Sequence, residues 1–188
     1  MSELSPRERI VDTAMRLFNE HGAHTVGIDR IIAESGVAKR TFYNHFPSKA
    51  ALLAEFFRRR DAVWFARIDA YVADPKLTPA GRVLAVFDAL AEWYGRPDFF
   101  GCSFIRGLSE FGDDGDSPEL ATCVREHFAR LEKRLAALVR PVRPNDFSTI
   151  AAQLMVLVAG GTVVAHATRD PAVATRNKAL AQLILESA

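Results

Sequence analysis

The sequence predicts an all-α protein built from about nine helices. Apolar residues recur at helical spacing along most of the chain, and no alternating strand pattern competes with them. Turn-forming residues separate these segments. Four helix starts are marked by a capping side chain placed before a proline, whose missing N–H costs nothing in the first turn: Ser5-Pro6, Thr78-Pro79, Ser117-Pro118 and Asp170-Pro171.

The segments between these markers define the predicted helices, which run over residues 6–21, 27–35, 38–45, 48–73, 79–95, 103–111, 118–139, 146–167 and 171–186. Ser5 and Glu8 have the spacing of a capping box. Ser48 and Asp146 are further candidate caps, and the acidic segment 112–116 is predicted to be a loop.

The run from Ile150 to Ala165 is strongly apolar and raises the possibility of a membrane span. It is interrupted by polar residues and glycines such as Gln153 and Gly160, and it falls short of the roughly 20 residues that a span needs. We therefore predict a helix that is buried on most sides within the protein, and no membrane association.

Residues 27–46, GIDRIIAESGVAKRTFYNHF, have the pattern of two short helices that meet at Gly36. Glycine adopts a positive φ without steric cost, so Gly36 can end the first helix and turn the chain into the second. Val37 and Phe42 are expected to pack beneath the second helix. The pattern predicts a helix-turn-helix.

The outward side of the second helix carries side chains suited to DNA. Lys39 and Arg40 can bond guanine or phosphate, and Asn44 can pair with adenine. Lys49, beside the cap Ser48, adds a charge where backbone N–H groups already favour an anion. Thr41, Tyr43 and His45 can donate to phosphates. The predicted DNA-binding residues are Gly27, Lys39, Arg40, Thr41, Tyr43, Asn44, His45 and Lys49.

A plainer interpretation is that two short helices with a glycine turn are only a structural element, and that their basic residues form a solvated face. The charge distribution favours DNA binding over this alternative. Residues 1–60 carry ten Lys and Arg against seven Asp and Glu, whereas the remainder carries fourteen against sixteen. A net charge of only +1 argues against a non-specific nucleic-acid coat and for contact through one small module.

The segment from Arg9 to Leu53 resembles the TetR family of bacterial transcriptional regulators. The resemblance rests on Ile10, Ala14, Leu17 and Phe18, then on Gly22, and then on IIAESGVAKRTFYNHFPSKAALL. It implies that the first three helices form a DNA-binding domain with the third as recognition helix, and that the helix starting at Ser48 leads to a ligand-binding domain. By matching position it implies DNA contacts by Lys39, Thr41, Tyr43, His45 and Lys49.

The sequence departs from the family pattern at two places. Arg40 stands where many members have a small residue, often glycine. Val26 and Gly27 replace hydroxyl residues that are common before the second helix. Glycine can still serve as an N-cap, but it provides no side-chain phosphate contact, for which Thr25 is a weak substitute.

The 188 residues are enough for two helical units. We expect a DNA-binding domain over residues 1–47 and an effector-binding and dimerisation domain over residues 48–188. The last two helices are expected to pair with their copies as a four-helix bundle across a twofold axis, as the resemblance also implies, which would suit a palindromic operator. The alternative is that both helices fill a monomer core. The candidate interface residues are Val156, Gly160, Val164, Leu180 and Ile184.

A region rich in aromatic residues lies between the predicted DNA-binding domain and the last two predicted helices. We expect a small apolar or amphipathic effector to bind there, between residues 84 and 166, although most single aromatics at helical spacing are expected to be core. Polar groups among apolar neighbours are further candidates, because a buried polar group must be paired or used. Arg106 and Glu110 sit four apart and can also simply pair with each other. The candidates are Phe87, Trp93, Tyr94, Phe104, Arg106, Glu110, His127 and His166.

Cys102 and Cys123 do not make a disulfide framework, and no signal segment precedes Ser5, so a cytoplasmic location is expected. Cys102 is either a small buried hydrophobe or a redox or electrophile sensor.

No metal site, cofactor or catalytic motif is predicted, so an enzyme is not expected. The expected protein is a ligand-responsive homodimeric repressor. The alternatives are a helical-bundle enzyme or small-molecule carrier with a vestigial helix-turn-helix, and an architectural DNA-binding protein, which would need a larger cationic surface.

Overall fold

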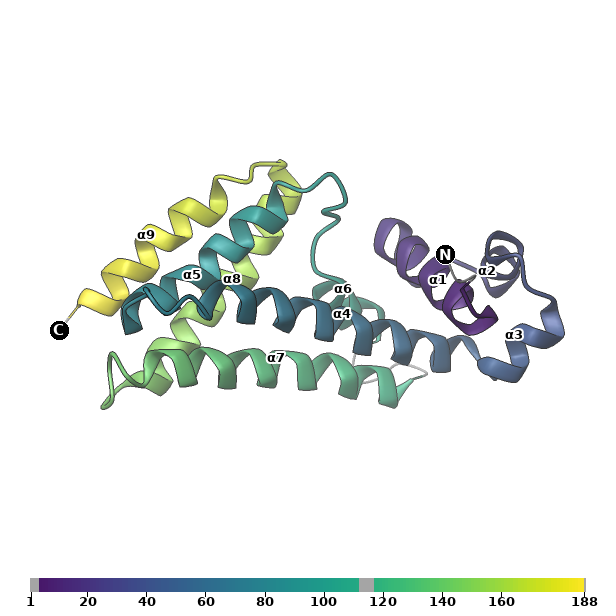
Figure 1. Cartoon of the computed structure of the whole chain (residues 1–188), viewed down its shortest axis with the longest axis horizontal. Helices are drawn as coiled ribbons and strands as arrows, with labels where there is room; N and C mark the ends of the chain where they lie inside the picture. Colours follow the sequence, from purple (N-terminus) through teal and green to yellow (C-terminus); the bar gives the residue numbers. More distant parts are fainter. Residues whose placement is uncertain (1–3, 112–116, 188) are drawn as a thin grey trace. The chain divides into compact units, whose positions relative to one another are not determined.

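The computed structural model describes residues 4–111 and 117–187. Within these ranges the regular structure is entirely helical (Figure 1), which confirms the predicted fold class. The helices are α1 (Pro6–His21), α2 (Ile28–Ser35), α3 (Lys39–His45), α4 (Lys49–Val72), α5 (Pro79–Tyr94), α6 (Ser103–Glu110), α7 (Pro118–Val139), α8 (Phe147–Thr168) and α9 (Val173–Glu186). Each predicted helix end agrees with the structure to within two residues. The loop predicted at 112–116 lies outside the described residues.

Side-chain caps fix several of these helix starts. The Ser5 hydroxyl accepts from the Glu8 backbone N–H at 3.3 Å, and the Glu8 carboxylate accepts from the Ser5 N–H at 2.9 Å, which completes the predicted capping box. The Ser48 hydroxyl accepts from a backbone N–H of the first turn of α4 at 3.1 Å, and Thr78 does the same for α5 at 3.0 Å.

Two expected caps behave differently. Asp146 precedes α8 but makes no cap bond, and its carboxylate accepts from the Arg143 guanidinium at 3.2 Å. Asp170 accepts from the Ala172 N–H at 2.9 Å, so the proline after it lies in a turn and α9 begins only at Val173. In both cases a short side chain is used by a nearer local partner.

The chain folds into two compact units, which are described separately. The first comprises residues up to 61 together with 103–125, and the second comprises residues 62–102 and 126 onward. The first unit therefore contains α1, α2, α3 and the first part of α4, together with α6 and the start of α7, because side chains from these later segments share its core.

The core of the first unit is aromatic. Phe18 of α1 is fully buried and meets Phe56 of α4 edge to face at 5.4 Å. Phe57 packs on Phe104 of α6 at 5.2 Å between ring centroids. A Cβ at Gly107 would come within 2.9 Å of a side-chain carbon of α7, so the absence of a side chain there lets α6 and α7 approach closely.

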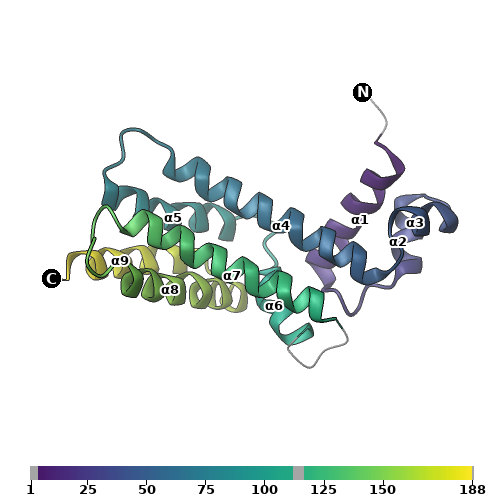
Figure 2. The same ribbon diagram turned by 90° about the horizontal axis from the view of Figure 1, so that it is seen from below.

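The second unit is built on α5, α8 and α9, which pack against one another, together with the remaining parts of α4 and α7 (Figure 2). Its core includes Phe87, Leu90, Leu135 and Leu154, all with an exposed fraction of 1% or less. The predicted core role of the aromatic face of α5 is thereby confirmed for Phe87 and for Tyr94, which is 6% exposed.

Helix α8 is less buried than expected. With 22 residues it is long and apolar enough to cross a membrane by length and composition, yet only a third of its most apolar window is buried. The expectation that it is buried on most sides is wrong, because Val156, Val163 and Val164 remain exposed. Its buried side packs on α9, where Asn177 donates to the Leu157 carbonyl at 2.8 Å.

Candidate nucleic-acid interface

The turn between α2 and α3 has the predicted form. Gly36 follows α2 in the left-handed conformation with a φ of 65°. Phe42 is fully buried, and Val37 and Ile31 are buried as well. These apolar anchors fix the orientation of α3, so the other side of this short helix faces solvent.

The outer side of α3 gathers most of the predicted DNA contacts. Lys39, Arg40, Asn44 and His45 are exposed, and Thr41 is half-buried. Tyr43 is 42% exposed and stands edge-on to the Phe42 ring at 5.4 Å. Two turns of helix thus present cationic, amide and hydroxyl groups together, which is the set needed for base and phosphate contacts in a major groove.

Asp29 adds a negative charge to this surface. Its carboxylate lies 3.4 Å from the Lys39 ammonium, and both side chains are strongly exposed. The sequence indicated only that Asp29 faces water. No periodicity signalled the pairing, because the two residues belong to different helices and meet only through the turn at Gly36.

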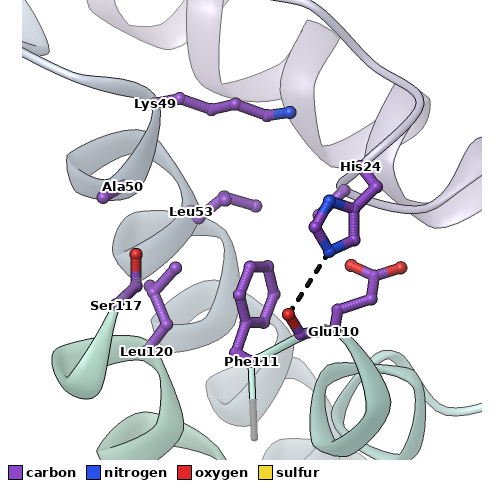
Figure 3. Close-up of a pocket in the computed structure, with 9 residues that line it drawn as sticks. His24, Lys49, Ala50, Leu53, Glu110, Phe111, Ser117 and Leu120 are labelled. Carbon is purple, nitrogen blue, oxygen red and sulfur yellow. Dashed lines mark hydrogen bonds between the residues drawn. The ribbon is translucent and has the colours of Figure 1, made fainter. Parts of the chain in front are cut away.

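Lys49 occupies the first turn of α4 and is only half-buried. Burial lowers the pKa of its ammonium, while the Glu110 carboxylate acts in the opposite direction. No carboxylate of the described residues lies within ion-pair distance of it. Its phosphate contact stays a prediction, and the side chain lies at the edge of a cavity (Figure 3).

Gly27 is exposed at the N-cap of α2, with ordinary extended backbone and no side-chain cap. The nearby Thr25 hydroxyl donates to the His21 carbonyl at 2.7 Å. Thr25 therefore satisfies the end of α1, and its hydroxyl proton is already used within the protein.

The first helices match a known protein family. Residues 10–56 match the model of "Bacterial regulatory proteins, tetR family", a segment that runs from α1 into α4. An uncharacterised HTH-type transcriptional regulator of Mycobacterium tuberculosis is 27% identical over 179 residues, which cover 88% of this chain and 86% of the relative. The HTH-type transcriptional regulator LmrA of Bacillus subtilis is 43% identical over 54 residues, or 29% of each chain.

The similarity continues through the rest of the fold. The crystal structure of a TetR-family transcriptional regulator from Streptomyces coelicolor superposes with a TM-score of 0.87 at 28% identity, covering 96% of this chain and 94% of that one. This chain belongs to the TetR family. It is a DNA-binding transcriptional regulator, and its family is not one of enzymes.

The predicted effector residues of this TetR-family protein are divided between the two units. Phe104, Arg106 and Glu110 belong to α6 in the first unit. Arg106 donates to the Asn19 carbonyl at 2.7 Å, which ties α6 to the end of α1. The other five candidates lie in the second unit: Phe87, Trp93, Tyr94, His127 and His166.

Several of the five are parts of the core of the second unit. Phe87 is fully buried, and the Tyr94 hydroxyl is 2.8 Å from that of Thr162. His127 is buried beside two phenylalanine rings. The expectation that His166 is also buried is wrong, because its side chain is exposed.

An aromatic cluster surrounds the more accessible candidates of the second unit. The Phe99 ring lies 5.0 Å from that of Trp93 and 6.0 Å from that of His166, as measured between centroids. Trp93 is half-buried and also contacts Trp64 at 5.1 Å. Phe99 belongs to the aromatic-rich region that the sequence indicates as a possible pocket lining. Trp64 lies before that region and was not predicted, since aromatic residues at helical spacing carry no signal that separates core from binding surface.

The candidate dimer residues of the TetR-family protein lie mostly in solvent. Val156 is 70% exposed, and Val164 and Leu180 are about half exposed. Gly160 is open, with nothing near its Cβ position, and Ile184 is half-buried. Leu183, which the helical spacing places on the same face of the last helix as Leu180 and Ile184, is exposed as well, and Val163 is an exposed apolar residue that was not predicted.

Among the described residues, no group of three His, Cys, Asp or Glu side chains is placed to hold a metal ion. Cys102 and Cys123 are both half-buried.

Proposed function

We propose that this TetR-family protein is a cytoplasmic homodimeric repressor that binds a palindromic operator and is released by a small apolar or amphipathic molecule. The observation that carries the proposal is the outer side of α3, where Lys39, Arg40 and Asn44 are exposed while Phe42 is buried and anchors the other side of the helix. The resemblance of the whole chain to TetR-family regulators supports the same role.

The side chains of α3 divide into two groups by chemistry. Lys39, Arg40 and Asn44 are proposed to read base edges, because a cation can bond guanine and an amide can bond adenine. Thr41, Tyr43 and His45 are proposed to donate to phosphates, together with Lys49 and the backbone near Gly27. Arg40 distinguishes this chain from members with a small residue there, so it is proposed to specify one operator position.

The exposed apolar residues of α8 and α9 support a dimer. Val156, Val163, Val164, Leu180 and Leu183 make up more than half of the exposed large apolar side chains of the described residues. Such a concentration is typical of a surface that another subunit covers. A twofold dimer would present two copies of α3 to the two halves of a palindrome.

The effector is proposed to bind in the second unit, near the aromatic cluster of Trp64, Trp93, Phe99 and His166. Trp93 and His166 are accessible members of this cluster, whereas Phe87 and Tyr94 are used in packing. Release would follow if the bound effector changed the separation of the two recognition helices.

The proposal is tested by selecting operators from a random duplex library with the purified protein and titrating the enriched site at several salt concentrations. We expect a palindrome with half-sites about one helical turn or slightly more apart. Arg40→Ala and Asn44→Ala should each relax the preference at particular positions. Lys49→Ala should weaken binding to all sequences and lower the salt slope by about 1.

The absence of sequence-specific binding would contradict the proposed function. If no sequence is enriched, and binding disappears at physiological salt in the wild-type protein, the repressor function is excluded. Glu132→Ala, an exposed change in the second unit, serves as the matched control that should leave operator binding unaltered.

A further inference from the structure

The first unit contains a cavity of about 300 Å³ that no predicted site includes as a whole. Its wall comes from four separate segments: the loop after α1, the start of α4, the end of α6 and the start of α7 (Figure 3). The volume is at the lower end of the roughly 300–1,000 Å³ found for ligand sites, so the cavity suits a molecule with a single ring or a short chain.

The inner part of the cavity is apolar. Leu53 and Leu120 are nearly fully buried and line it together with Ala50. The Phe111 ring stands between them and His24, on which it stacks with 5.8 Å between centroids and 21° between planes. These surfaces would cover an aromatic or aliphatic body, which gains free energy when it leaves water.

One edge of the cavity is cationic. The Lys49 side chain extends along it (Figure 3), and among the described residues its ammonium has no ion-pair partner. The cation is partly removed from water, and burial lowers its pKa. A bound anion would offset this desolvation more effectively than a neutral group, because charge-assisted hydrogen bonds are stronger.

Two further polar residues that line the cavity are His24 and Glu110. The His24 Nε2 lies 3.3 Å from the Glu110 carbonyl oxygen, which orients the ring so that Nε2–H donates. The Glu110 carboxylate is directed away from Leu53 and Phe111 (Figure 3). It would repel a second negative charge, so the cavity favours a ligand with one carboxylate at the Lys49 edge rather than a polyanion.

We propose that this cavity binds a small monocarboxylate with an aromatic or short aliphatic body, that Lys49 pairs with its carboxylate, and that this pairing withdraws Lys49 from operator phosphate. The regulatory half rests on the proposed DNA contact of Lys49. The site is separate from the effector site proposed in the second unit, so it provides a second input that competes directly for a DNA-binding side chain.

Binding is measured first without DNA, by calorimetry and by NMR titration of the full chain. The probes are benzoate, phenylacetate, 3-phenylpropionate and hexanoate, each compared with its uncharged amide. We expect at least one carboxylate to bind about tenfold more tightly than its amide. Lys49→Met keeps the aliphatic stem and should remove this preference.

The location is tested with a variant that fills the cavity. Ala50→Leu adds volume inside the cavity without changing charge and should abolish binding of the preferred carboxylate. Should Ala50→Leu fail to fold, nuclear Overhauser contacts between the probe and the Leu53 and Leu120 methyl groups of the wild-type protein locate it directly. The proposed site would be overturned if a folded Ala50→Leu variant bound the carboxylate as wild type does, or if the probe contacted residues elsewhere in the protein. It would also be overturned if no carboxylate bound in the millimolar range, or if each carboxylate and its amide bound with equal affinity.

The regulatory half is then tested on the selected operator. The preferred carboxylate should raise the operator Kd of the wild-type protein about fivefold and lower the salt slope by about 0.9. Ala50→Leu should bind the operator like wild type and show no response. A carboxylate that binds but leaves the operator Kd unchanged overturns the regulatory half of the proposal alone. Failure to select any operator overturns the proposed repressor function, while the titrations without DNA still show whether the cavity binds a carboxylate.

Discussion

Arg106 of α6 donates from Nη2 to the backbone carbonyl of Asn19 at 2.7 Å, and the same nitrogen lies 3.5 Å from the Phe18 carbonyl. The last carbonyls of a helix have no partner within it, and a guanidinium at this end also complements the helix dipole. Arg106 thus closes α1 from a segment more than 80 positions later in the sequence.

Arg106→Met should therefore destabilise the protein. The aliphatic stem is retained, so the loss comes from the hydrogen bond to a half-buried carbonyl and should be about 1–2 kcal/mol in the free energy of unfolding. Urea unfolding followed by circular dichroism measures it. Arg82→Met, an exposed change on α5, is the control, and equal stability of the two variants would contradict a structural role for the Arg106 bond.

Gly36→Ala should weaken the helix-turn-helix. At a φ of 65° an added Cβ meets no other atom, so the cost is that of the left-handed backbone alone, about 1 kcal/mol. Gly27→Ala is a matched control, because Gly27 has a φ of −80° and equally open surroundings. The two variants are compared by thermal unfolding, and a Gly27→Ala change as costly as Gly36→Ala would show that backbone conformation is not the cause.

Tyr94 should make stability fall at alkaline pH. Burial raises the pKa of its hydroxyl well above the ordinary value of 10.0, while Thr162 opposes this shift as a hydrogen-bond partner. The unfolded chain loses this proton above pH 10 and the folded chain keeps it, so the contribution is complete below pH 10 and decreases as the pH rises further.

Tyr94→Phe should flatten this alkaline decrease in the free energy of unfolding and cost about 1 kcal/mol at neutral pH through the lost hydrogen bond. Denaturant titrations across the alkaline range measure both effects. Tyr43→Phe, at an exposed position, should leave the slope as in wild type. A wild-type slope in Tyr94→Phe would show that other groups cause the decrease.

Asp29→Asn should strengthen DNA binding. The change removes a carboxylate 3.4 Å from the Lys39 ammonium and frees this cation for phosphate or guanine. We expect the Kd for all duplexes to fall roughly fivefold at low salt, with a smaller gain at high salt because the charges are exposed. Fluorescence anisotropy at two salt concentrations measures this, with Glu132→Gln as control; weaker binding would instead assign Asp29 a direct base contact.

Val156→Glu should dissociate the proposed dimer. The side chain is 70% exposed, so the change does not disturb the core of one chain, but it would place a charge in an apolar interface. Sedimentation equilibrium should show a monomer and the operator affinity should fall. Val63→Glu on α4, at 51% exposure, is the control; a monomeric wild type, or a Val156→Glu protein that remains dimeric, contradicts the interface.

Much of the helix-turn-helix was predictable because its determinants are local. The capping box at Ser5, the glycine at position 36 and the apolar spacing that buries Phe42 each act within a few residues, and the structure has all three. The exposed set on α3 follows from the same periodicity. Failures at Asp146 and Asp170 occurred where a nearby N–H or guanidinium competed for the same carboxylate.

Pairings between distant segments were not predictable in the same way. The Lys39–Asp29 pair, the bond from Arg106 to Asn19 and the cavity beside Lys49 all join residues that share no periodicity. The environment of α8 was wrongly expected for the same reason, since apolar composition does not tell a core from an uncovered surface.

By itself, the sequence determined the helices, their caps and turns and the chemistry of the recognition helix, because hydrogen bonding and steric preference act along the chain over one or two turns. Only the tertiary structure decided which apolar residues stay exposed on α8 and α9, which effector candidates are core, and which side chains meet across the first unit. Those outcomes depend on packing between helices, where burial and pairing are properties of several segments at once.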